Sequence, residues 1–484
     1  MKIIGKFTEK IKRMPPTVKA AMVYTVASFV TRGIHLITTP LFTRIMSVEQ
    51  IGVVSNYSTW GSYFSTVVAL GLTSGVINIA LKDFKNDRIG YIKSSQSLAT
   101  ISAIAFGVVT ALIYPFIEGF IGLPWYYMVL LFVTMLFGFS QSFWMSWQRY
   151  EYKYKAVGIV VISSSVLAAI GSLIAVIWAK RTGIEDLAFV RVFSSGLIAL
   201  LFSVPIFIYF LTRKKPLFRK DYAIFSLQLG LPMVVHTFSK TVLSASDRVM
   251  INAMEGSTAL GLYSVLYTVG SLSLIIWDSI DASYVPYMFE KLDKGDEHKK
   301  DVKKVSAILL FLFGIVSLLF SLFAPEMVWI IGGEQYMTAV YVAPPVAVGI
   351  FFIAMYNLYG DVLMYYKKTK YVMYCTLTAA VFNVVTNIIF IPKWGYIAAA
   401  YTTLASYALL AFIYYVVANK IAKEKIYNNG LFWAISLIVA IACLLCNLLY
   451  ANTTIRYVVI AIMLVLAIVF HKRVIAIIKL IRNK

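Results

Sequence analysis

Residues 157–179 read VGIVVISSSVLAAIGSLIAVIWA, a run without a single charged side chain. Basic residues flank it on both sides, at Lys153 and Lys155 and at Lys180 and Arg181. A helix needs about 20 apolar residues to cross the hydrocarbon core of a bilayer. This stretch therefore predicts a membrane-spanning helix with both ends in water.

The whole chain repeats this pattern. Of its 484 residues, 60% are hydrophobic and 14% are charged, whereas globular chains carry about 25% charged residues. We therefore predict an all-α polytopic membrane protein with about 14 transmembrane helices and without an extramembrane catalytic domain. The expected spans lie near residues 20–40, 54–80, 95–117, 126–146, 157–179, 187–211, 224–246, 259–284, 305–325, 339–363, 371–391, 396–418, 431–450 and 455–471.

The net charge of +22 follows from topology. Of the 44 lysines and arginines, 35 lie in one alternating set of connections and termini, 6 lie in the other, and Arg32, Arg191 and Lys240 lie inside spans. Because cytoplasmic loops are rich in lysine and arginine, both termini are expected in the cytoplasm. We predict a protein of the cytoplasmic (inner) membrane, with anionic lipid headgroups rather than nucleic acid as the partner of these charges.

An internal repeat predicts the domain organisation. The sequences GVVSNYSTWGS from Gly52 and GLYSVLYTVGS from Gly261 share the pattern G-x-x-S-x5-G-S at a shift of 209 residues. This shift equals six expected spans, so we predict two six-helix lobes related by a pseudo-twofold axis along the membrane normal. The predicted parts are a basic cytoplasmic tail at 1–19, an N-lobe at 20–218, a C-lobe at 219–425, and two appended spans with a basic C-terminal tail at 426–484.

Ionisable side chains inside spans are candidates for function, since they are unfavourable in lipid. Arg32 and His35 are three residues apart and share one face of the first span, and His236 and Lys240 are four apart on the seventh. The repeat places Lys240 beside the position of Arg32, so the two cations suit an anionic ligand. The alternative is that neighbouring helices satisfy each of them, and for the histidines a packing role is favoured.

Acids and amides form a second group of candidates. Asp278 and Asp281 share a face near the inner end of the eighth span, and Asp361 lies near the inner end of the tenth. We expect gate or interface roles for these acids, with ion or proton binding as the alternative. Asn383 and Asn387 face one way on the eleventh span, where they bind an ion or sugar hydroxyls or join helices by hydrogen bonds.

The sequence contains neither a metal-spaced His/Cys set nor a phosphate-cradling GxxxxGK[ST] loop. We therefore predict a protein that is not an enzyme and that has no catalytic residue, metal or cofactor. A membrane polysaccharide polymerase or ligase is the rival from another class. It would need a sizeable outer loop with catalytic residues, and the outer connections expected here are short.

Three stretches carry a family resemblance: TTPLFTRIMSVEQIG at 38–52, SDRVMIN at 246–252 with LGLYS at 260–264, and FNVVTNIIFIPKWGYIAAA at 382–400. With fourteen spans, the chain resembles the Wzx-type polysaccharide and O-antigen flippases, the polysaccharide transporter family of the multidrug/oligosaccharidyl-lipid/polysaccharide exporter superfamily. The resemblance implies a flippase for undecaprenyl-pyrophosphate-linked oligosaccharides that works by alternating access in capsule, O-antigen or exopolysaccharide synthesis. It also implies a polysaccharide polymerase and other synthesis-complex proteins as partners.

The resemblance implies a cationic cavity, which Arg32 and Lys240 match in kind and level. Related lipid II flippases line the cavity with several arginines and carry an Asn-x3-Asp pair where this chain has Asn383-x3-Asn387. The missing acid argues against sodium coupling and leaves membrane potential or protons as drivers. Cargo of the lipid II or teichoic-acid type stays open. A multidrug cation antiporter would want an acid on the first span, which has Arg32 instead.

Overall fold

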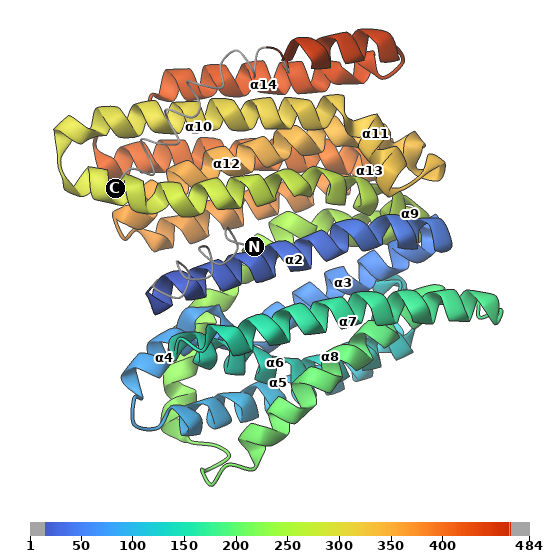
Figure 1. Ribbon diagram of the computed structural model, residues 1–484, viewed down its shortest axis with the longest axis vertical. Helices are drawn as coiled ribbons and strands as arrows, with labels where there is room; N and C mark the ends of the chain where they lie inside the picture. The colour runs from blue at the N-terminus through green and yellow to red at the C-terminus, as the bar shows by residue number, and fades with distance from the viewer. Residues whose placement is uncertain (1–14, 464, 466–484) are drawn as a thin grey trace, which may run out of the picture. The chain divides into compact units, whose positions relative to one another are not determined.

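The computed structural model describes residues 15–463 and 465, and these residues form helices without a strand (Figure 1). Two short irregular helices, η1 and η2, interrupt the α-helices. The helices are α2 (Pro16–Ile45), α3 (Val48–Val68), η1 (Leu72–Val76), α4 (Ile77–Asp83), α5 (Arg88–Ile121), α6 (Trp125–Tyr150), α7 (Tyr154–Arg181), α8 (Leu187–Leu211), α9 (Lys220–Asp293), α10 (Asp296–Leu322), α11 (Ala324–Ile331), η2 (Glu334–Val342), α12 (Ala343–Tyr365), α13 (Thr369–Ala422), α14 (Asn429–Leu449) and a last helix over Thr453–Met463.

These helices confirm the all-α membrane fold predicted from the sequence. Nine helices in the described part of the chain are long and apolar enough to cross a membrane, and α9 and α13 each carry two expected spans. The fourteenth span begins in the helix Thr453–Met463 and continues outside the described residues. Most of the basic tail 1–19 and the C-terminal tail also lie outside them.

Single glycines separate the paired spans of α9 and α13. Gly256 (φ 86°) and Gly395 (φ 71°) adopt the left-handed region that glycine tolerates best, so each helix turns back within one residue. Subtracting the repeat shift of 209 residues from these two positions gives the N-cap residues of α3 and α8. The same subtraction relates the N-cap residue of η2 to that of α6. The pairs are Ser47 and Gly256, Pro124 and Gly333, and Asp186 and Gly395.

The expected span 54–80 is not one continuous helix. The chain breaks between α3 and α4, where Leu70 (φ 50°) and Gly71 (φ 73°) are left-handed and η1 follows as a π-helix. A Cβ atom on Gly71 would collide with the carbonyl group of Gly230 on α9, so the backbones approach too closely for any side chain. The length of the apolar run predicted this span but not the break inside it. Hydropathy along one segment does not show where its backbone touches another segment.

The described contacts divide the chain into two compact units, Met1–Thr241 and Val242–Lys484. This boundary lies inside α9, whereas the sequence predicts a lobe boundary at 218/219. The beginning of α9 belongs to the first unit because it packs on α3: Thr66 Oγ1 and Thr241 Oγ1 lie 3.4 Å apart, and the rings of Tyr63 and Phe238 lie 5.8 Å apart. The assignment of whole spans to two lobes stays a prediction.

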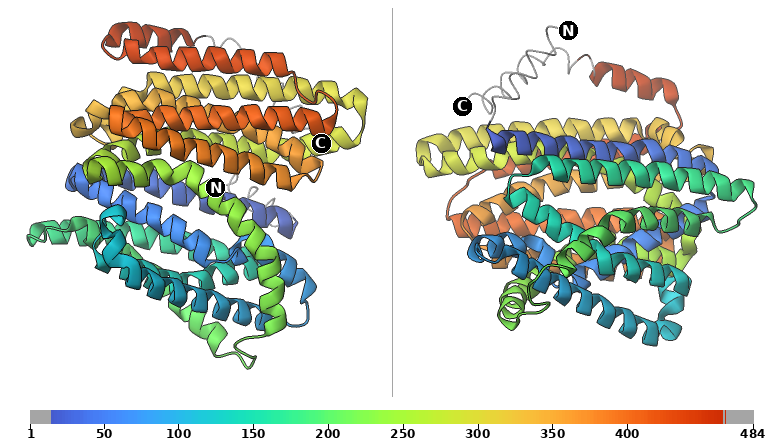
Figure 2. Two further views of the ribbon diagram at one scale, coloured as in Figure 1. Left: turned by 180° about the vertical axis from the view of Figure 1, so that it is seen from behind. Right: turned by 60° about the horizontal axis from the view of Figure 1, so that its bottom comes forward.

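Each unit is a layered helix bundle. In the first unit α2 lies alongside α7, and α8 packs on both α6 and α7. In the second unit α12 is the central helix, in contact with α10, α13 and α14, and Figure 2 shows α10 and α14 side by side from behind. Trp277 of α9 is fully buried in this bundle against Phe313 of α10.

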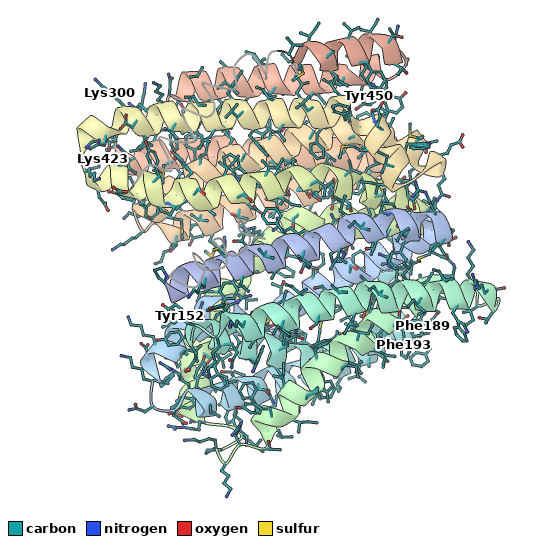
Figure 3. The ribbon with its side chains drawn as sticks, in the orientation of Figure 1. Tyr152, Phe189, Phe193, Lys300, Lys423 and Tyr450 are labelled. Carbon is teal, nitrogen blue, oxygen red and sulfur yellow. The ribbon has the colours of Figure 1, made fainter. Side chains whose placement is uncertain are left out.

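Each unit has ends of different character (Figure 3). Tyr152 marks the end of the first unit that holds the basic connection 149–155, and Phe189 and Phe193 mark the opposite end. In the second unit Lys300 and Lys423 lie at one end and Tyr450 lies at the other. This separation is the arrangement that the positive-inside pattern predicts.

Candidate functional site

The first candidate cations lie on an exposed face of α2. Arg32 and His35 are exposed, and so are the neighbouring apolar side chains Phe29 and Leu36. The opposite side of α2 packs on α7, where Thr31 Oγ1 lies 3.3 Å from a serine hydroxyl. The first unit therefore presents Arg32 and His35 on an exposed face of α2 that is rich in apolar side chains.

Arg191 of α8 joins this region, although the sequence analysis counted it among the cations inside spans and did not make it a site candidate. Its guanidinium lies 3.8 Å from the ring centroid of Phe42 on α2, and its charge interacts with His35. An arginine over an aromatic face is a stabilising cation–π contact. Arg191 is the cationic residue that sequence reasoning missed, because spacing along one chain does not show which helices pack together.

Lys240 and His236 lie one turn apart in the beginning of α9, and the positive charge of Lys240 acts on the histidine. Lys240 is exposed, whereas His236 is half-buried and its Nδ1 has no hydrogen-bond partner among the described residues. The contacts thus bring His35 to Arg191 and His236 to Lys240. Arg32 and Lys240 lie on two helices of the same compact unit rather than one on each.

Asn383 and Asn387 are fully buried in the second unit and form the centre of a polar network. Asn383 Oδ1 accepts from Ser246 Oγ at 2.7 Å and from Asn387 Nδ2 at 3.1 Å. Asn383 Nδ2 donates to Thr403 Oγ1 at 3.3 Å and to Ser406 Oγ at 3.1 Å. The hydroxyl of Thr402 donates to Asn387. Protein groups thus engage both amides and tie α9 to the two halves of α13.

The carboxyl groups of Asp281 on α9 and Asp361 on α12 lie close enough to interact with each other, and the charge of the exposed Asp278 acts on Asp281. Two carboxyls can hydrogen-bond to each other only if one of them carries a proton. Asp281 Oδ1 and Asp361 Oδ2 are buried and have no partner in the described part of the chain. The structure therefore brings together the three acids that the sequence singled out: Asp281 and Asp361 form a pair that can hold a proton, and Asp278 lies near it.

An aromatic groove of about 430 Å³ follows the two halves of α13. Phe382, Phe390, Trp394 and Tyr401 line it, and the rings of Phe390 and Trp394 stack at 5.2 Å. Aromatic faces of this kind suit sugar rings or an isoprenoid chain. The sequence did not single out these residues, because tyrosine and tryptophan are common at both membrane–water interfaces.

Among residues 15–463, no three His, Cys, Asp or Glu side chains are placed to hold a metal ion. The prediction that the protein uses no cofactor stays a prediction. Apolar spans that carry cations, a carboxyl pair and buried amides define a multi-pass membrane protein of transporter type.

The chain belongs to the polysaccharide biosynthesis protein family, whose sequence model matches residues 17–292. The MatE family model matches residues 232–389. A protein of the Lsg locus of Haemophilus influenzae is 24% identical over 431 residues, which cover 84% of this chain and 98% of that protein. These matches confirm the resemblance predicted from the three sequence stretches.

Two solved structures share the fold. The lipid II flippase MurJ in an inward closed conformation has a TM-score of 0.71 and 14% identity, covering 94% of this chain and all of that chain. An inward-facing multidrug resistance MATE family transporter of the MOP superfamily has a TM-score of 0.57 and 11% identity, covering 83% of this chain and 96% of that chain. Both are polytopic membrane transporters, and this chain shares their fold.

Proposed function

We propose that this protein is a flippase that moves undecaprenyl-pyrophosphate-linked oligosaccharide units from the inner to the outer leaflet of the cytoplasmic membrane. The flippase works by alternating access, serves capsule, O-antigen or exopolysaccharide synthesis, and catalyses no covalent step. Family membership over residues 17–292 supports the polysaccharide pathway, and the fold shared with MurJ supports transport of a lipid-linked substrate. Its termini face the cytoplasm, and a polysaccharide polymerase takes up its product.

The observation that carries the proposal is the exposure of Arg32 and Lys240 on apolar membrane helices. A charged side chain at this depth is unfavourable against lipid tails, so its exposed face requires a polar environment such as a water-filled cavity. Arg32 binds a pyrophosphate oxygen with its guanidinium fork, and Lys240 adds a second positive charge. His35 lies one turn from Arg32 on α2, and His236 lies one turn from Lys240 on α9, and both donate hydrogen bonds to the same headgroup.

Membrane potential drives the transfer in this proposal. Moving one charge through 100 mV is worth about 2.3 kcal/mol, so a headgroup with two negative charges gains about twice that on leaving an inside-negative cell. The neighbouring carboxyls of Asp281 and Asp361 offer protons as a second source of energy. Protein groups already occupy the side chains of Asn383 and Asn387, which favours a structural role over a sodium site.

The experiment is headgroup translocation in proteoliposomes under a set membrane potential, with undecaprenyl-pyrophosphate oligosaccharide supplied on one leaflet. Arg32→Ala and Lys240→Ala are each compared with a charge-matched control at an exposed position outside the spans, Arg181→Ala and Lys393→Ala. We expect loss of potential-sensitive flipping in the first two variants and wild-type rates in the controls. Wild-type flipping by both Arg32→Ala and Lys240→Ala would show that these residues are not the binding site. Efflux of an organic cation in place of flipping would assign the protein to the multidrug class.

Cargo of the lipid II or teichoic-acid type is the second candidate, because the MurJ fold match extends over 94% of the chain. Lipid II, a teichoic-acid precursor and a polysaccharide repeat unit share the polyprenyl phosphate chemistry and differ in the sugar. Parallel assays with each cargo separate the candidates. Faster flipping of lipid II than of the polysaccharide unit would replace the first proposal with the second.

A further inference from the structure

A cavity of about 560 Å³ lies at the basic end of the second unit, between the beginning of α10 and the beginning of α14. It is separate from the cations of α2 and α9, which belong to the first unit. Figure 3 shows Lys300 at this end of the bundle. Six of the residues that line the cavity carry its chemistry: Lys300, Lys303, Lys304, Lys425, Ile308 and Leu431.

The cavity wall is strongly positive, since among the side chains that the structure describes four lysines line it and no acid does. The nearest acids in the sequence are engaged with other lysines: Asp301 pairs with Lys291 at 2.9 Å, and Glu424 pairs with Lys299 at 2.5 Å. Within the described part of the chain, none of the four wall lysines forms an ion pair. Four ammonium groups around one cavity favour an anionic ligand.

The first turn of α14 adds backbone donors to the same wall. The helix begins at Asn429, and the side chain of Asn428 accepts a hydrogen bond from the N–H of Leu431 at 3.3 Å. The N–H groups of Asn429 and Gly430 precede that capped position and have no partner within the helix. A helix N-terminus carries partial positive charge and binds phosphate groups well.

The polar floor of the cavity is fixed by hydrogen bonds. Asn429 Nδ2 donates to Asn419 Oδ1 at 3.0 Å, and Asn429 Oδ1 accepts from the hydroxyl of Tyr359 at 2.9 Å. The hydroxyl of Tyr427 donates to the carbonyl of Leu358 at 3.0 Å. These contacts join α12, α13 and α14, so the cavity is a preformed site rather than a gap between mobile lysines.

An apolar wall continues from the basic rim toward the membrane. Ile308 on α10 and Leu431 on α14 line the cavity, and Leu431 is 43% exposed. Both helices then continue as apolar spans, His298–Leu322 and Asn429–Leu449. A ligand in this cavity thus meets positive charge at one end and hydrocarbon at the other.

We propose that this cavity binds the phosphate headgroup of an anionic membrane lipid at the cytoplasmic surface. The phosphate contacts the four lysines and the first turn of α14, and the beginning of an acyl chain lies against Ile308 and Leu431. A soluble phosphate carries the same charge but has no apolar part to contact Ile308 and Leu431. We therefore propose a lipid as the occupant. The inference is independent of the proposed flippase function, since binding is measured without a transport substrate.

The test uses the full chain in detergent and measures retention of added phosphatidylglycerol by native mass spectrometry, with phosphatidylcholine as the neutral lipid. The cavity variant replaces Lys300, Lys303, Lys304 and Lys425 with glutamine. The matched control replaces four exposed lysines outside the cavity at the same end of the unit, Lys367, Lys368, Lys370 and Lys420. Both variants lose the same charge.

We expect the cavity variant to bind phosphatidylglycerol at least about tenfold more weakly, and the control to stay within about twofold of the wild type. A single change, Leu431→Glu, places a negative charge on the apolar wall and should weaken binding to a similar degree while the melting temperature stays unchanged. Equal losses in the two lysine variants would overturn the site in favour of general surface attraction. Displacement of the lipid by an equal concentration of inorganic phosphate or glycerol 1-phosphate would overturn the lipid as occupant.

Discussion

The carboxyl groups of Asp281 on α9 and Asp361 on α12 interact with each other, and each keeps one buried oxygen without a partner among the described residues. Two carboxyls can hydrogen-bond to each other only when one carries a proton, so protonation of the pair is coupled to its geometry. Asp361→Asn keeps a donor for Asp281 but abolishes the shared proton. We expect wild-type flipping to accelerate several-fold when a pH gradient is imposed at zero membrane potential, and the variant to show no acceleration.

The control for this prediction is Asp293→Asn on α9, the helix that also carries Asp281. The exposed carboxylate of Asp293 accepts a hydrogen bond from the Tyr365 hydroxyl at 2.8 Å. This variant should respond to the gradient like the wild type. Replacing sodium with potassium should leave the wild-type rate unchanged. A rate that follows sodium and ignores the pH gradient would contradict the role of the pair.

Arg32 and Lys240 should act on one ligand and therefore show coupled effects. If each variant to alanine slows flipping about tenfold, independent sites predict about a hundredfold loss for the double variant. Two groups that hold the same pyrophosphate should instead give about a tenfold to thirtyfold loss, because the second change removes contacts that the first has already weakened. Initial flipping rates of the wild type, the two single variants and the double variant measure this coupling. A hundredfold loss in the double variant would show that the two residues act at independent sites.

Asn383 should be structural. Asn383→Ala removes four hydrogen bonds and leaves the buried groups of Ser246 and Asn387 without a partner. We expect the free energy of unfolding to fall by about 3 kcal/mol, since each unsatisfied buried group costs about 1–3 kcal/mol. Thermal unfolding in detergent tests this against Asn78→Ala, an exposed asparagine on α4 that should change stability by less than about 0.5 kcal/mol. Equal stabilities for both variants would point away from a structural role.

The contact between Gly71 and Gly230 should tolerate no side chain. A Cβ atom on Gly230 would collide with the carbonyl of Leu70, and one on Gly71 would collide with Gly230. We expect Gly230→Ala to lower the free energy of unfolding by about 2 kcal/mol or more through forced backbone shifts. Gly33→Ala is the matched control on α2, where a Cβ atom meets nothing within 4 Å, and helix propensity should make it neutral or slightly stabilising.

Asp87 makes stability depend on pH outside the membrane. Desolvation alone would raise its pKa, but hydrogen bonds from Lys215 and Tyr222, the charge of Lys215 and the N–H of Gly90 outweigh it, so the pKa is lowered. Lys215 Nζ lies 2.8 Å from Asp87 Oδ1, and the Tyr222 hydroxyl lies 2.9 Å from Oδ2. A lowered pKa in the folded state contributes stability above the unfolded value of about 3.9, and this stability is lost as pH falls through the folded pKa.

We expect Asp87→Asn to be less stable than the wild type by about 1 kcal/mol at pH 7, because the groups around the carboxylate are partly exposed. The difference should persist down to about pH 4 and shrink below it. Thermal unfolding at pH 7, 5 and 3.5 follows this change. A difference that is constant over the whole range would assign the effect to packing rather than to charge.

The sequence predicted the spans well, because hydropathy over about 20 residues is a property of one segment. It also singled out Asp281 and Asp361, since a charged residue inside an apolar run is visible without a structure. It missed Arg191 over Phe42 and the contact of Gly71 with Gly230, because both depend on which helices pack together. The boundary between the two compact units is likewise invisible in the sequence, since α9 is continuous across it and only tertiary contacts mark it.

The turns at Ser47, Asp186, Gly256 and Gly395 carry a consequence for the history of the chain and for engineering it. Their common shift means that the two halves have kept equal length between these turns, as after duplication of an ancestral gene without net insertion. At Gly256 only one residue leaves the helical conformation, so no loop separates the two helical segments. An epitope tag or fluorescent reporter should therefore be tolerated in the basic connection 213–218. The same insertion after Gly256 should prevent the chain from folding in the membrane.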